Sequence, residues 1–302
     1  MDLSIIIPSF NAGETIRDLT LQINEALADK FSFEIIFVFD NGGNKTWQII
    51  EKLKWEFPSL VKAYHLARNY GQHRAIQFGF SKAQGDFVIT IDEDLQHDPA
   101  DILKLIRKQK EGNYDIVYGK FSNSQHKGIR NRVSYVLRKI LKHFISTLYD
   151  NYSPYRLIKH DISMRVSTLV SPYTFIDDFL SRITQNIAFE DILHHKRKQG
   201  RSSYTFLRLI KYGLYILLAY SKLVPFLLAT SAVFVVIGSV LFVLSVISPE
   251  NLNAELINNR TIFASYGIGV FFIILSFIGS FINHRNSIIN TGPIRLLNEN
   301  SI

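Results

Sequence analysis

Two uncharged apolar runs in the last third of the chain constrain its fold more than any other feature. They cover residues 224–247 and 262–282, and neither contains an Asp, Glu, Lys or Arg. Each exceeds the ~20 apolar residues that a helix needs to cross a hydrocarbon core of about 30 Å. The alternative is a pair of buried core helices, but such helices are usually shorter. The sequence therefore predicts a transmembrane hairpin over residues 224–283.

The charges around these runs predict their orientation. The short connection between them carries Glu250, Glu255 and a single Arg260. Basic residues flank the hairpin on both outer sides: Lys196, Arg197, Lys198, Arg201, Arg208, Lys211 and Lys222 before it, and His284, Arg285 and Arg295 after it. Because segments rich in Lys and Arg stay in the cytosol, we expect a multi-pass protein of the cytoplasmic (inner) membrane with both termini in the cytosol.

The first 120 residues alternate between short apolar segments and segments with helical spacing. The predicted strands are 3–7, 33–39, 61–66, 87–91 and 115–118, and the predicted helices are 14–28, 46–56, 72–82 and 99–111. This alternation produces right-handed crossovers and a mostly parallel sheet. We therefore predict an α/β domain over residues 1–200, interfacial helices over 201–223, the hairpin, and a cytoplasmic tail over 284–302.

Asp92 and Asp94 follow the predicted strand at 87–91 with one residue between them. Residues two apart on a strand point to the same side. Open α/β sheets bind ligands at the carboxyl ends of their strands, and a carboxylate pair there suits a hard divalent cation that bridges a diphosphate. The alternative is two solvated acids in the loop before the helix that begins near Pro99.

Composition and missing motifs argue against several classes of protein. The chain has no Gly-x-Gly-x-x-Gly and no Walker loop, which argues against a dehydrogenase or an ATPase. Its formal net charge of +8 would suit nucleic acid, but no nucleic-acid-binding module is recognisable. Anionic lipid and phosphate groups are the partners that the apolar runs favour. The absence of cysteine fits a reducing compartment.

Two further stretches, residues 129–148 and 206–220, place apolar residues at helical spacing opposite Lys and Arg. Basic amphipathic helices of this kind lie in a membrane surface. For the first stretch the alternative is a helix that packs on the sheet, whereas the second runs directly into the first apolar run. Together they are expected to hold the α/β domain against the bilayer.

Five motifs occur in the order found in one enzyme family. They are residues 5–11 (IIIPSFN), 68–86 (RNYGQHRAIQFGFSKAQGD), 92–99 (DEDLQHDP), 150–156 (DNYSPYR) and 197–204 (RKQGRSSY). They resemble the opening strand with Pro-Thr-Tyr-Asn, then Arg-Asn-x-Gly-x-x-x-Ala, Asp-Ala-Asp-Leu-Gln, Asp-x-Thr-Ser-Gly-Phe-Arg and Arg-x-x-Gly-x-Ser-Lys-Tyr. The chain thereby resembles the family 2 glycosyltransferases, and among them the dolichyl-phosphate mannose synthase and bactoprenol glucosyltransferase group.

This resemblance implies a GT-A-type fold and a membrane-bound, inverting glycosyltransferase. The expected reaction moves one sugar from a UDP- or GDP-linked donor to a polyprenyl phosphate such as undecaprenyl phosphate, on the cytoplasmic leaflet. Its expected role is the assembly or modification of cell-surface glycans. The expected cofactor is Mg²⁺ or Mn²⁺, which neutralises the leaving nucleoside diphosphate. A homo-oligomer is left open.

The resemblance also assigns roles to single residues. The metal is expected at Asp92, Asp94 and Gln96, and the catalytic residues are expected to be Asp94 and Arg156. Nucleotide-sugar binding is expected of Pro8, Asn11, Asp40, Arg68, Asp92 and Glu93. The acceptor phosphate is assigned to Arg130, Arg132 and Arg156, since guanidinium suits phosphate oxygens. The alternative for each of these arginines is a surface or lipid-facing charge.

The chain departs from the family pattern at several positions. Ala12 stands where an acid usually follows Pro-Thr-Tyr-Asn, and the Asp-Asp-Gly-Ser turn retains one acid, Asp40. Pro154 replaces a glycine and Ser203 replaces a lysine. Because Asp92 and Asp94 are both present, we expect an altered sugar or acceptor preference and not a loss of activity.

Two alternatives to a phosphate acceptor stay open. Transfer to a hydroxyl of a lipid-linked oligosaccharide needs a general base, and Asp177 and Asp178 lie where many hydroxyl-using relatives place an acid. The other alternative is a non-catalytic membrane scaffold. Only the intact Asp92/Asp94 pair speaks directly against a scaffold.

Overall fold

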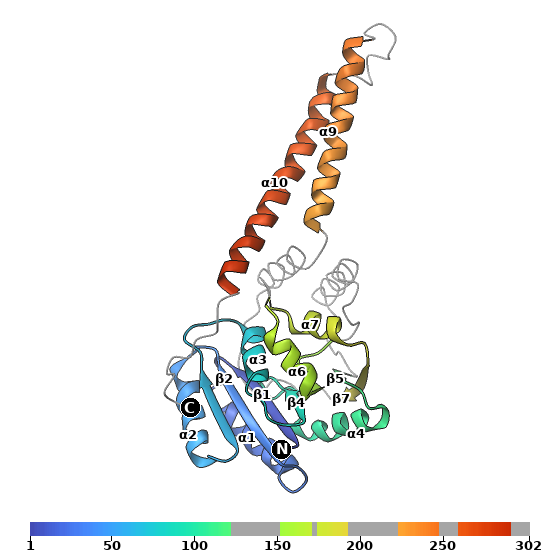
Figure 1. Ribbon diagram of the computed structural model, residues 1–302. Coiled ribbons are helices and arrows are strands. Elements are labelled where there is room, and N and C mark those ends of the chain that lie inside the picture. Colours follow the sequence, from blue (N-terminus) through green and yellow to red (C-terminus); the bar gives the residue numbers. More distant parts are fainter. Residues whose placement is uncertain (122–151, 171–173, 193–222, 248–258, 291–302) are drawn as a thin grey trace.

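The computed structural model describes residues 1–121, 152–170, 174–192, 223–247 and 259–290 (Figure 1). Within these ranges an α/β domain is followed by two long helices. The strands are β1 (Leu3–Ser9), β2 (Phe33–Phe39), β3 (Val61–His65), β4 (Phe87–Thr90), β5 (Ile116–Phe121), β6 (Arg156–Lys159) and β7 (Ile187–Ile192). The helices of the domain are α1 (Thr15–Leu27), α2 (Asn44–Glu56), α3 (Gln72–Phe80), the short 3₁₀ helix η1 (Pro99–Asp101), α4 (Ile102–Gly112), α6 (His160–Thr168) and α7 (Ile176–Ile183).

A seven-stranded sheet forms the centre of the domain, in the order β3-β2-β1-β4-β6-β5-β7. β1 to β4 run parallel to one another, and β6 runs antiparallel to both of its neighbours, β4 and β5. β7 runs parallel to β5. Within the described sheet β6 is therefore the one reversed strand, and the other strands present their carboxyl ends at the same edge.

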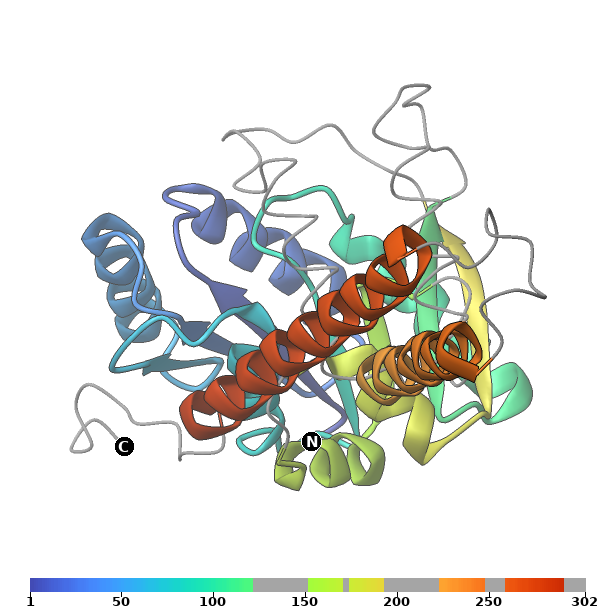
Figure 2. The same ribbon diagram turned by 90° about the horizontal axis from the view of Figure 1, so that it is seen from above.

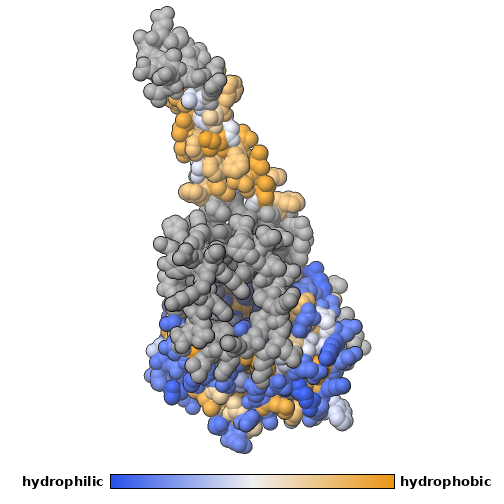
Figure 3. Space-filling view, turned by 180° about the vertical axis from the view of Figure 1, so that it is seen from behind, coloured by the Kyte–Doolittle hydropathy of each residue, from blue (hydrophilic) through white to orange (hydrophobic). Residues whose placement is uncertain are grey.

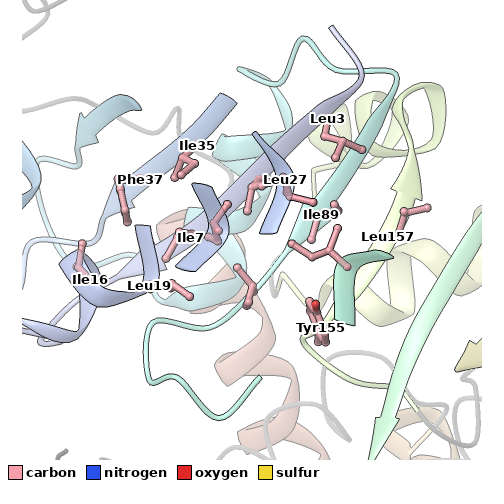
Figure 4. Packing of buried hydrophobic residues seen from close by; sticks show 14 of the residues in the cluster. Leu3, Ile7, Ile16, Leu19, Leu27, Ile35, Phe37, Ile89, Tyr155 and Leu157 are labelled. Atoms are coloured by element: carbon pink, nitrogen blue, oxygen red, sulfur yellow. The ribbon is translucent and has the colours of Figure 1, made fainter. Parts of the chain in front are cut away.

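Helices cover both faces of the sheet because the strands are apolar on both sides, as expected of parallel strands. On one face α1, α2 and α4 pack on a cluster that includes Leu3, Ile5 and Ile7. Figure 4 shows this cluster, in which side chains of α1 meet those of β1 and β2. On the other face α3, α6 and α7 pack on a second cluster that includes Ile6 and Val88. The alternation along β1 thus divides the core into two layers.

The predicted α/β fold is confirmed, and the predicted strands and helices of the first 120 residues are observed with small shifts at their ends. β6, β7, α6 and α7 were not predicted. β6 has only four residues, and its first residue is Arg156, so its sequence carries neither a long apolar run nor clear alternation.

The two apolar runs form α9 (Leu223–Ile247) and α10 (Asn259–Asn290). The helices lie side by side and extend away from the α/β domain (Figures 1 and 2). The segments Pro225–Leu244 and Thr261–Phe281 are long and apolar enough to cross a membrane. Only 11% of the first and 28% of the second is buried within the protein. The low burial argues against the alternative of soluble core helices, and Figure 3 shows the apolar surface along the hairpin.

Small side chains allow the two long helices to approach closely. The Ser231 hydroxyl donates a hydrogen bond to the carbonyl of Gly269 across the helix pair (3.0 Å). A Cβ at Gly238 would lie 2.7 Å from Ser265 Oγ, so a larger residue there would push the helices apart. The predicted amphipathic stretches at 129–148 and 206–220 lie outside the described residues. The predicted domain boundaries stay predictions.

Candidate active site at the carboxyl edge of the sheet

The carboxyl ends of four parallel strands bring the predicted site residues to one edge of the sheet. In the strand register Ser9 lies opposite Phe39, and Phe39 lies opposite His65. Thr90 of β4 lies opposite Ile6, and the following N–H of Ile91 donates to the Ile6 carbonyl (3.2 Å). The segments that follow these strands contain Asn11, Asp40, Arg68, Asp92, Glu93 and Asp94. This edge is where open α/β sheets bind ligands.

The segment after β1 is held against the segment after β2. The N–H of Gly43 donates to the side-chain oxygen of Asn11 (2.7 Å) and to the carbonyl of Phe10 (3.2 Å). A Cβ at Gly42 would lie only 1.7 Å from the Phe10 carbonyl oxygen, so this close approach requires glycine. Pro8 is buried within β1, and its expected role in nucleotide-sugar binding stays a prediction.

Asp40 follows β2 and holds the segment that contains Arg68. Its carboxylate accepts hydrogen bonds from the N–H groups of Tyr70 (2.6 Å) and Gly71 (2.7 Å). Gly71 has a φ of 90°, which favours glycine at the start of α3. Burial raises the pKa of Asp40 to about 6, and the two backbone hydrogen bonds offset part of that effect. The structure supports a role in loop positioning, and direct contact between Asp40 and a nucleotide base stays a prediction.

Asp92 and Asp94 lie in a turn beyond β4 and not on the strand itself. β4 ends at Thr90, and Leu95 has a φ of 58°, so strand alternation does not set the positions of the two acids. Instead, hydrogen bonds orient them. The side-chain amide of Gln72 donates to Asp92 Oδ1 (2.6 Å), and the backbone N–H of Gln96 donates to Asp94 Oδ1 (3.2 Å).

The donor set on this turn fits a hard divalent cation. Carboxylate oxygens of Asp92 and Asp94 and the amide oxygen of Gln96 are ligands that Mg²⁺ and Mn²⁺ accept, and all three side chains are partly exposed. Within the described part of the chain, no three or more His, Cys, Asp or Glu side chains gather into a metal site. A cation held by one or two carboxylates, with the remaining positions filled by substrate phosphates and water, matches this arrangement.

Glu93 lies between the two acids in the sequence, but its side chain contacts the segment after β1. Its carboxylate accepts hydrogen bonds from the N–H groups of Phe10 (3.0 Å) and Asn11 (3.4 Å). Burial raises the pKa of Glu93 to about 7, the two backbone hydrogen bonds act in the opposite direction, and the nearby Asp94 raises it slightly further. Glu93 therefore connects the acidic turn to the loop of Asn11.

Arg68 lies at the same edge, after β3. Its guanidinium carbon lies 4.6 Å from the ring centre of Tyr70, a distance typical of a cation–π contact. The contact keeps Arg68 beside the loop that Asp40 holds, which is compatible with the predicted role in nucleotide-sugar binding. That role stays a prediction.

Arg156 occupies a position that the sequence did not indicate. Its guanidinium is buried, forms an ion pair with Asp177 and donates through Nε to the hydroxyl of Thr90 (3.0 Å). The Tyr118 hydroxyl also donates to Asp177 (3.0 Å). The alternative of a surface or lipid-facing charge is therefore wrong for Arg156. Its side chain is 1% exposed and engaged with Asp177, and the expected catalytic and acceptor-phosphate roles of Arg156 stay predictions.

The second candidate base, Asp178, is also engaged. Its side chain is fully buried and forms an ion pair with Arg182 (3.0 Å) at the next turn of α7. The two other predicted acceptor-binding residues, Arg130 and Arg132, lie outside the described residues. So do residues 150 and 151 of the motif at 150–156 and all of the motif at 197–204.

The structure also reveals site residues to which the sequence assigned no role. Gln72 orients Asp92, and its neighbour His73 accepts a hydrogen bond at Nδ1 from the N–H of Ile176 (3.5 Å). The start of α3 thus connects the acidic turn to the start of α7. Thr90 accepts a hydrogen bond from Arg156, and Tyr118 donates one to Asp177. Gln72 and His73 lie within the motif at 68–86, which was the available signal for them.

Comparisons with known proteins agree with this geometry. Among solved structures, glucosyl-3-phosphoglycerate synthase from Mycobacterium tuberculosis, in complex with Mn²⁺, UDP-glucose and phosphoglyceric acid, has a TM-score of 0.51. It is 14% identical and the match covers 72% of this chain and 78% of that chain. This likeness supports the GT-A-type fold.

Among curated proteins the chain is similar to undecaprenyl-phosphate 4-deoxy-4-formamido-L-arabinose transferases. The relative from Shewanella sediminis is 32% identical over 211 residues, which cover 69% of this chain but 63% of that protein, so the match spans less than two thirds of its length. The relative from Proteus mirabilis is 29% identical over 283 residues, which cover 92% of this chain and 84% of that protein.

The family comparison covers the α/β domain. Residues 4–169 match the family described as glycosyl transferase family 2. The matched residues include β1 to β6, the acidic turn and the loops that Asp40 and Glu93 hold. The chain belongs to glycosyl transferase family 2.

Proposed function

We propose that this protein transfers one sugar from a nucleotide sugar to a polyprenyl phosphate at the cytoplasmic face of the inner membrane. The observation that carries the proposal is the similarity to the Proteus mirabilis undecaprenyl-phosphate transferase, which extends over 92% of the chain. A match of this extent includes the paired apolar helices as well as the α/β domain. A soluble relative with a different acceptor would not be expected to share both parts.

The donor is proposed to bind at the carboxyl edge of the sheet. Asn11, Asp40 and Arg68 lie on the three segments that follow β1, β2 and β3, and Asp40 holds the segment of Arg68 through Tyr70 and Gly71. In the strand order β3-β2-β1-β4 these segments lie on one side of the turn of Asp92 and Asp94, and the segment after β1 is next to it. The arrangement supports a nucleotide at the first three segments with its diphosphate directed toward the acidic turn.

Asp92, Asp94 and Gln96 are proposed to hold a divalent cation, Mg²⁺ or Mn²⁺. When bound, such a cation supplies positive charge to the leaving diphosphate. The side chains of the turn are oriented before a ligand arrives, because Gln72 holds Asp92 and the Gln96 N–H holds Asp94. This preorganisation lowers the cost of assembling the site.

The environment of Asp177 and Asp178 favours a phosphate acceptor over a hydroxyl. A general base needs to reach the proton that it removes, but both side chains are buried and form ion pairs with Arg156 and Arg182. A phosphate acceptor is largely ionised near neutral pH and needs no base from the protein. Arg130 and Arg132 remain the proposed contacts of the acceptor phosphate.

The apolar hairpin is proposed to keep the enzyme beside its lipid acceptor. α9 and α10 expose apolar side chains along most of their length, including Phe226, Val236, Phe271 and Phe277. Since hydrocarbon is the environment in which such a surface is stable, the hairpin is expected to cross the bilayer. The α/β domain then stays at the leaflet where polyprenyl phosphate is available.

A panel of nucleotide sugars tests the proposal. Membranes with the wild-type protein are incubated with each UDP- and GDP-sugar, undecaprenyl phosphate and Mn²⁺ or Mg²⁺, and lipid products are identified by mass spectrometry. We expect a product with one added sugar for at least one donor, and none in EDTA or with Asp94→Asn. Product formation by Asp94→Asn at the wild-type rate would contradict the assigned site, and no lipid product with any donor would contradict the function.

A further inference from the structure

Glu93 lies between Asp92 and Asp94 in the sequence, which suggests a contact with the metal or the donor. Its side chain instead contacts the segment after β1. Its two carboxylate oxygens accept hydrogen bonds from the N–H groups of two consecutive residues, Phe10 (3.0 Å) and Asn11 (3.4 Å). We propose that Glu93 is a positioning residue, which holds the segment after β1 in the conformation that accepts the nucleotide sugar. This inference rests on the proposed function for its substrate, but its structural part is testable without turnover.

The main chain of Glu93 strengthens the same connection. The Thr15 hydroxyl lies within hydrogen-bond distance of two carbonyls, that of Glu93 (3.0 Å) and that of Ala12 (2.9 Å), and its proton is shared between them. Glu93 therefore contacts both the beginning and the end of the segment that connects β1 to α1. Hydrogen bonds to both the side chain and the main-chain carbonyl of Glu93 therefore hold the acidic turn against this part of the chain.

The opposite side of the segment is held by the loop after β2. The Gly43 N–H donates to Asn11, and the Gly13 N–H donates to the Thr46 hydroxyl (3.1 Å). The segment thus lies between two sets of hydrogen bonds, and Glu93 is the charged acceptor among the described acceptors of its backbone N–H groups. Hydrogen bonds to a carboxylate are roughly twice as strong as neutral ones, so its loss is expected to affect the segment most.

Apolar packing does not fix this segment by itself. Phe10 is 38% exposed and Asn11 is also exposed, whereas Ala12 packs on the core, so burial holds residues 10 and 11 less firmly than Ala12. A segment held mainly by exposed backbone hydrogen bonds opens easily. Its position in the donor site is therefore expected to depend on the carboxylate of Glu93.

Direct contact between Glu93 and the donor is the competing role. Both carboxylate oxygens already accept backbone N–H groups, and a carboxylate repels the diphosphate of a nucleotide sugar. The family pattern has alanine at this position, so the reaction itself does not need an acid here. Positioning accounts for the observed contacts without placing a negative charge on the substrate.

Substitution of Glu93 tests the proposal through two independent readouts. The first is amide hydrogen exchange of peptides that cover residues 8–14 in the detergent-solubilised protein. We expect Glu93→Ala to increase exchange at Phe10 and Asn11 while β1 stays protected. Glu93→Gln keeps one acceptor oxygen and should be intermediate. The matched control is Glu14→Ala, which removes an exposed acid that pairs with Lys45 at 3.4 Å and should leave exchange at residues 10 and 11 unchanged.

The second readout is steady-state kinetics with donor and acceptor varied separately. We expect Glu93→Ala to raise the donor KM roughly tenfold or more, because misplacement of a binding segment weakens donor binding, with a much smaller change in kcat and in the acceptor KM. Unchanged exchange at residues 10 and 11 in Glu93→Ala would overturn the positioning role. So would a large fall in kcat with an unchanged donor KM. If the wild type fails to transfer sugar, the proposed function fails, while the exchange experiment still tests Glu93.

Discussion

The Arg156 guanidinium and the Asp177 carboxylate form an ion pair inside the domain, where the two side chains are only 1% and 4% exposed. The pair joins β6 to the start of α7, and Thr90 at the end of β4 and Tyr118 of β5 hydrogen-bond to it. Thr90 is two residues before Asp92. The buried charges therefore fix α7 and three strands close to the acidic turn.

Removal of one member of this pair is expected to destabilise the protein strongly. Asp177→Ala leaves the Arg156 charge buried without its partner, which typically costs about 3–5 kcal/mol of the free energy of unfolding. The double variant Arg156→Met/Asp177→Leu removes both charges and should recover most of the loss. Thermal unfolding of the detergent-solubilised proteins measures both effects.

The exposed pair of Arg17 and Glu56 (2.8 Å) is the matched control for that experiment. Glu56→Ala should barely change the unfolding midpoint, since exposed ion pairs contribute little. An Asp177→Ala protein as stable as the wild type would contradict the burial of the pair.

Gln72 is expected to control metal affinity although it is not expected to touch the metal. Its amide holds Asp92 Oδ1 at 2.6 Å, and loss of such outer partners typically costs 10–100-fold in metal affinity. Gln72→Ala should therefore raise the Mn²⁺ concentration needed for half-maximal activity by at least tenfold. The control is Gln48→Ala on the exposed face of α2, and equal Mn²⁺ requirements for the two variants would refute the role of Gln72.

Asp40 is expected to make stability depend on pH. Burial raises its pKa to about 6 in the native protein, whereas an unfolded Asp has a pKa of about 3.9. Between about pH 4 and 6 the native state holds a proton at Asp40 that the unfolded state has lost, so the Asp40 contribution to stability falls as pH rises through this window. A shift of this size corresponds to about 3 kcal/mol.

Comparison with Asp40→Asn isolates this contribution. The stability of the variant relative to the wild type should increase from pH 4.5 to pH 7, whatever the constant effect of the substitution. Asp18→Asn, at an exposed position of α1, should show no such trend. A constant difference between Asp40→Asn and the wild type across this range would show that the Asp40 carboxyl is not buried in solution.

Much of the fold followed from local sequence. β1 to β4 are apolar and the helices between them have clear spacing, so strand–helix alternation was sufficient to predict the sheet. A local pattern also indicated that Asp92 and Asp94 follow β4, but it did not predict that they lie in a turn beyond the strand. The contacts of Glu93 and Gln72 did not follow from local sequence, because their partners lie 82–83 and 20 residues away in the chain and only the folded sheet edge brings them together.

β6 and the Arg156–Asp177 pair illustrate what local sequence does not contain. An arginine at the start of a four-residue strand argues against a buried position, because burial of an unpaired charge is costly. Asp177 compensates that charge from 21 residues away, in a helix that packs on the sheet. The compensation is tertiary, so local sequence left Arg156 between a contact with the acceptor phosphate and a surface charge, and the structure shows that its side chain is buried.

The proposed membrane topology is testable because the chain contains no cysteine. Single cysteines at Ser248, between the apolar helices, and at Asp29, on the exposed surface of the α/β domain, should differ in accessibility. In intact cells an impermeant maleimide should label position 248 and should label position 29 only after permeabilisation. Equal labelling at both positions would contradict a hairpin with the catalytic domain in the cytosol.

The choice of acceptor tests the central claim most directly. The wild-type protein is supplied with its preferred nucleotide sugar and with either undecaprenyl phosphate or undecaprenol, and the lipid products are identified by mass spectrometry. The account predicts a single sugar joined to the lipid through the phosphate, and no product from the alcohol, because Asp177 and Asp178 are buried in ion pairs and do not serve as a base. A glycosylated alcohol, with no product from the phosphate, would contradict it.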